Sequence, residues 1–359
     1  MTLKETEKRL PTLSEYLGMV LPCEGSRDDD RINQSGMVTT GRKDEFFLVQ
    51  TSPTHYRMMP GPEFTPRLYR GQNKRYPECK PQIFRNINKT NCRQKYCDGL
   101  YWTAKQYELT YLVFHHPAVQ DMLRWSVEGL SFSFDIRGIA QHYQYQTQLL
   151  DVTRHKDIAM FFATHNLVGK GLRPEPAIGN EAVLYTMDAR TLWDNQDSAG
   201  VELLALGIDP LPRSAAQGAF ALELGLHSDL EKIPGVSAET FLVTEELASS
   251  ALEKVGGVNE VFPYDPFEPV ISKLRDSGTV CHQAIELTVR AQATPPGMTA
   301  SDVAEIIKEG GYQVTFSDPD LPDEKILKAA EKEWKARRNY YLDRIRSRGV
   351  SDHYNGNPI

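Results

Sequence analysis

The chain has 359 residues, enough for one large domain with appended segments or for two domains. Its 41 lysines and arginines stand against 48 aspartates and glutamates, and this net charge of −7 argues against a general affinity for nucleic acid or anionic membranes. No apolar run approaches a membrane span and the first residues lack a signal-peptide core, so we expect a soluble, cytoplasmic protein without a membrane partner.

Residues 1–66 are predicted to be an N-terminal extension. Residues 13–21 fit one short helix, and residues 45–50 fit a strand. Prolines at positions 53, 60, 62 and 66 predict no regular structure before a strand at 67–69.

The following stretch is predicted to be helical. Apolar residues recur at helical spacing in 104–116 and in 118–128, with Pro117 as the break between them. Phe132, Ile136, Ile139 and Tyr143 follow at intervals of three and four, which indicates one face of another helix. Segment 158–163 is apolar nearly all round, which predicts a helix buried in the core.

Strands are predicted at 182–187, 218–224 and 240–244, and helices at 300–309 and 322–348. The order predicts an α+β fold, with a helical first half packed on a mostly antiparallel sheet, plus a C-terminal helix. We expect three parts: 1–66, a core domain at 67–275, and a C-terminal segment at 276–359. The last helix carries an apolar stripe, which favours docking on its own domain over binding a partner. The stripe consists of Ile326, Ala330, Trp334, Tyr341 and Ile345.

The five cysteines indicate reduced thiols rather than a disulfide framework, because their number is odd and the chain is long. No Cys-x-x-Cys pair occurs among Cys23, Cys79, Cys92, Cys97 and Cys281, so we expect no metal site. Glycine-rich phosphate loops of the dinucleotide or P-loop type are also absent from the sequence.

Polar residues lie where several predicted elements end. Arg70 ends a strand, His142 ends a helix, Asp151 follows an apolar pair, and Gln217 begins a strand. Because binding sites are often built at such ends, we expect these four side chains to meet in one polar cleft. Arg70 offers a planar donor fork for phosphate or carboxylate.

Each of these residues also has a structural interpretation. Arg70 can form an ion pair with Asp151, and His142 can be a hydrogen-bonded residue at a helix end rather than a general acid or base. Asp151 or Thr153 can cap the helix at 158–163. Gly218 can mark a β-bulge next to Gln217.

Four segments in this order resemble the FRG-domain family, over roughly residues 67 to 275. The family has an aromatic-Arg-Gly tripeptide, a Gln-His-Tyr and Leu-Leu-Asp segment before an apolar helix, a Gln-Gly-x-Phe segment after an arginine, and a Phe-Pro segment. The matching residues are Tyr69-Arg70-Gly71, Gln141-His142-Tyr143 with residues 147–153 and 157–163, Arg213 with Gln217-Gly218-Ala219-Phe220, and Val261-Phe262-Pro263.

The same arrangement resembles ADP-ribosyltransferases, which implies NAD as the cofactor and a nucleotide, a small molecule or a protein target as partner. By this resemblance the catalytic residues would be Arg70, His142, Asp151 and Gln217. Arg70 would hold the diphosphate or a ribose, His142 and Tyr143 would position the nicotinamide end, and Gln217 would occupy the third motif. A carboxylate would stabilise the oxocarbenium-like centre, and Glu223, Glu286 or Asp151 remain open for this role. The alternative is a non-catalytic nucleotide-sensing or protein-interaction module. The expected cofactor-binding residues are Tyr69, Arg70, Gly71, Gln72, Tyr143, Thr147, Thr153, Gly218 and Phe220.

Overall fold

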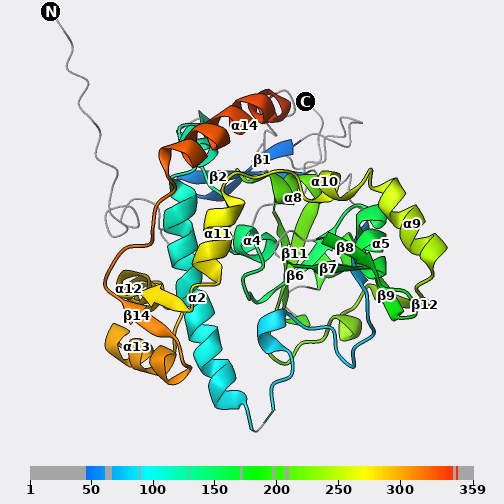
Figure 1. Cartoon of the computed structure of the whole chain (residues 1–359), viewed down its shortest axis with the longest axis horizontal. Coiled ribbons are helices and arrows are strands. Elements are labelled where there is room, and N and C mark those ends of the chain that lie inside the picture. The colour runs from blue at the N-terminus through cyan, green and yellow to red at the C-terminus, as the bar shows by residue number, and fades with distance from the viewer. Residues whose placement is uncertain are drawn as a thin grey trace, which may run out of the picture.

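The computed structural model describes residues 46–60, 67–88, 90–127, 129–169, 173–195, 199–206, 210–342 and 345–346. Helices and sheets are both prominent, and the largest sheet is antiparallel throughout, which confirms the predicted α+β fold (Figure 1). The helix expected at 13–21 lies outside the described residues. The predicted division at residues 66 and 275 stays a prediction.

The largest sheet has six strands in the order β10-β11-β6-β3-β9-β12. Their side chains alternate between the two faces. One face carries Leu68, Val152, Tyr185 and Phe220 in a continuous apolar core. The strands are β3 (Arg67–Gln72), β6 (Leu149–Thr153), β9 (Glu181–Asp188), β10 (Val201–Ala205), β11 (Ala219–Leu224) and β12 (Val236–Leu242).

The opposite face of this sheet is covered by short helices. Helix α5 (Lys156–Thr164) lies on β3, and α9 (Glu245–Lys254) packs outside it. Helices α4 (Ile136–His142) and α8 (Pro212–Ala216) cover the part near β6 and β11. Because α5 is apolar nearly all round, it fills the core as the sequence predicts.

The long helix α2 (Cys92–Phe114) separates this sheet from a C-terminal group (Figure 1). The group buries Val280, Ile285, Val303 and Ile307 against α2. It consists of β13 (Thr279–Cys281), α12 (His282–Arg290), α13 (Ala300–Glu309) and β14 (Gln313–Thr315), and α11 (Glu268–Arg275) also contacts α2.

A second sheet has the order β15-β1-β2-β5-β4. Helix α14 (Glu324–Leu342) lies beside it and buries Ala330, Trp334 and Tyr341 in the protein, which confirms that it docks on its own chain (Figure 1). The bounds are β1 (Phe46–Ser52), β2 (His55–Pro60), β4 (Ser126–Val127), β5 (Leu130–Phe132) and β15 (Ile345–Arg346), with α3 (Pro117–Met122) packed against α14.

The remaining elements are short. They are η3 (Gln82–Phe84), β7 (His165–Val168), β8 (Arg173–Pro176), α6 (Ala189–Asp194), η4 (Leu230–Lys232) and α10 (Val258–Val261). Within the described residues, no helix combines the length and apolar character that crossing a membrane requires.

Several predicted boundaries are wrong. The prolines do not prevent β2, because Pro53 precedes it and Pro60 is its last residue. The helix predicted at 118–128 ends at Met122, and the chain then turns at Gly129 (φ 83°) into the hairpin of β4 and β5. The stripe at 132–143 is not one helix, because Asp135 caps α4 by accepting from the Arg137 amide at 2.9 Å.

The ends of other elements also differ from the prediction. Helix α2 begins at Cys92 rather than at residue 104. Strand β12 ends at Leu242, because the Thr244 hydroxyl caps α9 by accepting from the Leu247 amide at 3.2 Å. Helix α14 spans Glu324–Leu342 instead of 322–348, and Ile345 lies in β15.

Candidate functional site

Arg70 and Asp151 lie where β3 and β6 separate, and His142 interacts with Asp151 and Gln217. Strand β3 pairs with β9 along six residues but with β6 at one position, Tyr69 opposite Thr153. Beyond that pair the ladder stops, with Arg70 on one strand and Asp151 on the other. We call this place the β3–β6 split. Main-chain groups that leave a ladder need other hydrogen-bond partners, so a split favours polar side chains.

Arg70 bridges the split through a main-chain contact. Its Nη1 donates to the main-chain oxygen of Asp151 at 2.7 Å. The ion pair considered for these two residues is therefore wrong: the arginine bonds the carbonyl and not the carboxylate. The Arg70 Nε is buried and has no hydrogen-bond partner among the described residues.

The Asp151 carboxylate is held from the other side by α4. Its Oδ2 accepts from the Gln141 amide at 2.9 Å, and the Gln141 oxygen accepts in turn from the Thr147 hydroxyl. Thr147, an expected cofactor-binding residue, thus orients Gln141 and also accepts from the Leu149 amide at 3.1 Å. The second oxygen, Oδ1, is buried without a partner in the described part of the chain.

His142 ends α4 and is only 7% exposed. Burial lowers its pKa, and the positive charge of Arg213 lowers it further, while Asp151 and Gln217 act in the opposite direction. The imidazole is therefore neutral at pH 7. Its Nε2 is buried and forms no hydrogen bond of good geometry with a described residue, and the Gln217 side chain is a polar neighbour of the ring. A neutral imidazole suits a hydrogen bond to a ligand better than proton donation.

Arg213 was part of a motif but was not predicted to be a site residue. It is 6% exposed, and its Nη1 donates to the main-chain oxygen of His142 at 3.2 Å. The guanidinium lies 4.3 Å from the centre of the Tyr143 ring and 3.7 Å from Glu268. It therefore fixes the end of α4, which carries His142.

The sequence predicted that Gln217 starts a strand, and this is wrong, because Gln217 caps the C-terminal end of α8. Its amide donates to the Val261 carbonyl at 3.2 Å, and its main-chain oxygen accepts from the Thr153 hydroxyl at 2.6 Å. Gly218 follows with a φ of +53°, which makes it a turn between α8 and β11 rather than a bulge.

Thr153 and Asp151 do not cap α5. The residue at its N-cap is His155, without a side-chain capping bond, and the His155 amide donates to the Thr153 hydroxyl at 3.0 Å. The end of β6 is thus tied both to the turn at Gln217 and to the start of α5.

Other expected cofactor-binding residues have packing roles. A Cβ on Gly71 would lie 1.7 Å from the Ala159 carbonyl oxygen, so glycine lets α5 approach β3. The Gln72 amide donates to the Lys74 carbonyl at 2.7 Å. Tyr143 is buried and donates to Asp265, and Phe220 belongs to the sheet core. Tyr69 is half-buried at the one pair that joins β3 to β6.

The three candidate carboxylates lie in different settings. Glu223 binds Arg137 at 2.6 Å and stands opposite Glu202 across the β10–β11 ladder. Glu286 is exposed on α12, 3.4 Å from His282. Of the three, Asp151 is the one that lies at the β3–β6 split.

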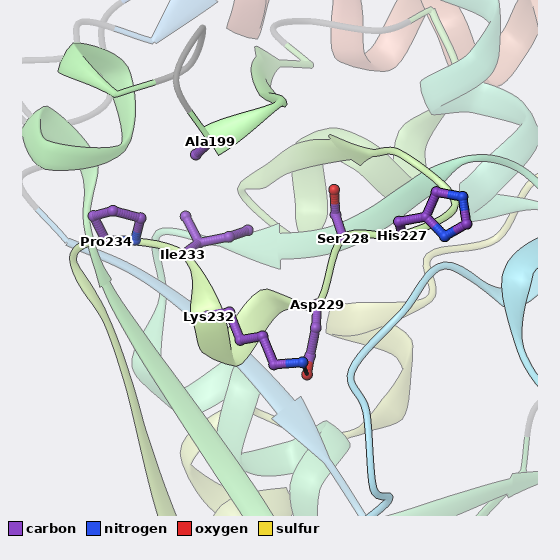
Figure 2. Close-up of a pocket in the computed structure, with 7 residues that line it drawn as sticks. All are labelled: Ala199, His227, Ser228, Asp229, Lys232, Ile233 and Pro234. Atoms are coloured by element: carbon purple, nitrogen blue, oxygen red, sulfur yellow. Dashed lines mark ion pairs between the residues drawn. The ribbon is translucent and has the colours of Figure 1, made fainter.

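A separate hollow of about 380 Å³ lies beside η4. Figure 2 shows His227 and Ser228 at one end and Lys232 bent back toward Asp229, 3.8 Å away. Asp229 also accepts from the Cys79 amide at 3.0 Å, so its carboxylate serves the packing of this loop. None of the predicted site residues lines this hollow.

Within the described ranges no three His, Cys, Asp or Glu side chains gather as a metal-binding group. The family model described as FRG domain matches residues 65–169, which include Arg70, His142 and Asp151. No curated protein and no solved structure matches the chain.

Proposed function

We propose that this chain, as a member of the FRG-domain family, binds a nucleotide at the β3–β6 split, with NAD as the ligand and ADP-ribosyl transfer as the activity. One observation carries the proposal. Arg70 Nε, Asp151 Oδ1 and His142 Nε2 are all buried polar atoms without a partner among the described residues. Such atoms are rare in folded proteins, and these three, with Arg213 Nε as a fourth in the same set of motifs, fit a ligand that supplies the missing partners.

The three atoms differ in kind, and together they match a phosphorylated sugar. A guanidinium N–H suits a phosphate oxygen. A carboxylate oxygen suits a ribose hydroxyl, and a neutral imidazole suits either a hydroxyl hydrogen or a hydroxyl oxygen. The fit therefore supports a ligand that has an anionic end and a hydroxyl-bearing ring.

Asp151 is the proposed carboxylate of the transfer reaction. Breaking the bond between the ribose C1′ and the nicotinamide nitrogen leaves positive charge on the ring, which a nearby carboxylate stabilises. The bonding pair leaves with nicotinamide, and a hydroxyl or amine of the acceptor forms the new bond to C1′ and releases a proton. Glu223 is engaged by Arg137, which supports Asp151 over Glu223 for this role.

The alternative is a non-catalytic nucleotide-sensing or protein-interaction module. Several motif side chains are already used by the protein, because Gln217 bonds Val261 and Tyr143 bonds Asp265. Among the described residues, Asp151 is the one carboxylate whose charge acts on the neutral His142. A site with one carboxylate and no charged acid suits retention of a nucleotide as well as its turnover.

The test measures NAD binding by calorimetry and nicotinamide release by chromatography on the same protein samples. We expect Asp151→Asn to reduce nicotinamide release by at least about a hundredfold while NAD binding changes less. Arg67→Ala is the control, since Arg67 is an exposed residue of β3, the strand that carries Arg70. Binding without release by the wild type would support the sensing module, and absence of both would refute the proposed function.

A further inference from the structure

We infer that Arg85 and Arg70 together form a subsite for a diphosphate. The inference deepens the proposed function and rests on its assignment of a nucleotide to the β3–β6 split. Arg85 belongs to none of the motifs that drew attention to this region in the sequence. It directly follows η3, in the connection between β3 and α2.

The connection that carries Arg85 lies on the same face of β3 as Arg70. Strand alternation places Leu68, Arg70 and Gln72 on one face. The Cys79 thiol lies 3.6 Å from the Gln72 side-chain oxygen, and Cys79 shares the apolar core with Leu68. The segment after Cys79 therefore crosses the face from which Arg70 reaches the split.

Arg85 is held in place and keeps its terminal amino groups for another partner. Its Nε donates to the Lys80 carbonyl at 2.9 Å, which orients the guanidinium. The two terminal nitrogens have no hydrogen bond to any described residue. Arg70 likewise uses one terminal nitrogen for Asp151 and leaves its Nε without a described partner. An oriented guanidinium with free donors is suited to bidentate binding of phosphate.

The positive charge of Arg70 acts on Arg85. The pKa of Arg85 is lowered, first by burial and next by the charge of Arg70, while Asp151 acts in the opposite direction more weakly. Neither arginine forms an ion pair with a described carboxylate, whereas Arg75, Arg137 and Arg337 each do. Two partly buried like charges are unfavourable unless an anion lies between them.

The charge count favours an anionic ligand. Two guanidinium groups and the Asp151 carboxylate leave one net positive charge, because His142 is neutral. Two separate donor forks match the two phosphoryl groups of a diphosphate better than one. Asp151 connects Arg70 to α4, since its carbonyl accepts from Arg70 and its carboxylate accepts from Gln141, while its buried Oδ1 has no partner among the described residues.

The test compares ADP, AMP and inorganic pyrophosphate by calorimetry at constant ionic strength. We expect the wild type to bind ADP more tightly than AMP. Arg85→Ala should weaken ADP and pyrophosphate about tenfold or more and AMP less, because one charge-assisted contact to the second phosphoryl group is lost. Arg85→Lys should lie between, since it keeps the charge and loses the fork. Arg67→Ala should bind as the wild type does.

Two results would overturn the subsite: unchanged ADP and pyrophosphate affinity in Arg85→Ala and Arg85→Lys, or no pyrophosphate binding by the wild type. Melting temperatures of the ligand-free variants identify any that fail to fold, and Arg85→Lys then decides. The same variants distinguish failure of the subsite from failure of the proposed transferase activity. Pyrophosphate binding that depends on Arg85, without nicotinamide release, would support the subsite and refute the transferase activity. Nicotinamide release that is unchanged in Arg85→Ala would support the transferase activity and refute the subsite.

Discussion

Replacing Gly71 by alanine separates a packing role from a ligand-binding role for this motif residue. The added Cβ would lie 1.7 Å from the Ala159 carbonyl oxygen and 2.7 Å from the Ala163 nitrogen, where ordinary contact begins at 3.4 Å. Both atoms belong to the main chain of α5, so no side-chain rotation relieves the clash. Either α5 or β3 has to move.

The expected loss of stability is large. Overpacking a core typically costs about 1–3 kcal/mol, and a main-chain clash belongs at or above the upper end, so we expect about 3 kcal/mol or more. This is a large share of the roughly 5–15 kcal/mol that stabilises a folded domain. Urea unfolding followed by circular dichroism measures the difference.

Gly99→Ala is the matched control. Gly99 lies in α2 with no atom within 4 Å of its added Cβ, so alanine should leave stability unchanged or raise it by up to about 1 kcal/mol. The argument is refuted if Gly71→Ala unfolds at the wild-type urea concentration. Wild-type stability combined with lost NAD binding would instead assign Gly71 to the ligand.

Three further predictions concern stability. Lys105→Met should cost about 3–5 kcal/mol by leaving the buried Glu108 carboxylate without its cation, and Lys105→Met with Glu108→Gln should recover part of that loss in urea unfolding. The pKa of buried His116 is lowered to about 3, so as pH falls below about 6.5 the unfolded chain gains a proton that the folded chain does not, and stability falls. His116→Asn keeps an acceptor for the helix cap and should make this fall shallower between about pH 6.5 and pH 4. Trp334→Ala should cost about 3–5 kcal/mol, whereas exposed Glu331→Ala should change stability by less than about 0.5 kcal/mol, as thermal unfolding can compare.

The sequence predicted those elements whose pattern is local. The helix at 300–309 matches α13 residue for residue, and the segments at 158–163 and 182–187 lie within α5 and β9. Their apolar spacing is uninterrupted, so the pattern alone defines them. The predicted boundaries were wrong where a single capping side chain determines where a helix begins, as Asp135 does for α4 and Thr244 does for α9.

The candidate site was predictable only in part, because its geometry depends on contacts between distant segments. The motifs pointed to Arg70 and Asp151, but no sequence pattern shows that β3 and β6 share a single residue pair. That fact decides that Arg70 binds a carbonyl rather than a carboxylate. Arg85 was missed because no motif marks it and because the effect of the Arg70 charge on it depends on the fold of the β3–α2 connection.

The contact between Arg70 and Asp151 determines which substitutions can test function. Arg70→Ala removes a donor to a possible ligand and also the bond that ties β3 to β6, so it changes stability and binding together. Asp151→Asn keeps the main-chain oxygen to which Arg70 donates, and a side-chain oxygen to accept from Gln141. It therefore removes the carboxylate charge while both structural bonds can persist. If the motif served packing alone, Asp151→Asn would change neither the melting temperature nor the increase in melting temperature that NAD causes. If the variant keeps the wild-type melting temperature but NAD no longer raises it, a ligand must bind at Asp151.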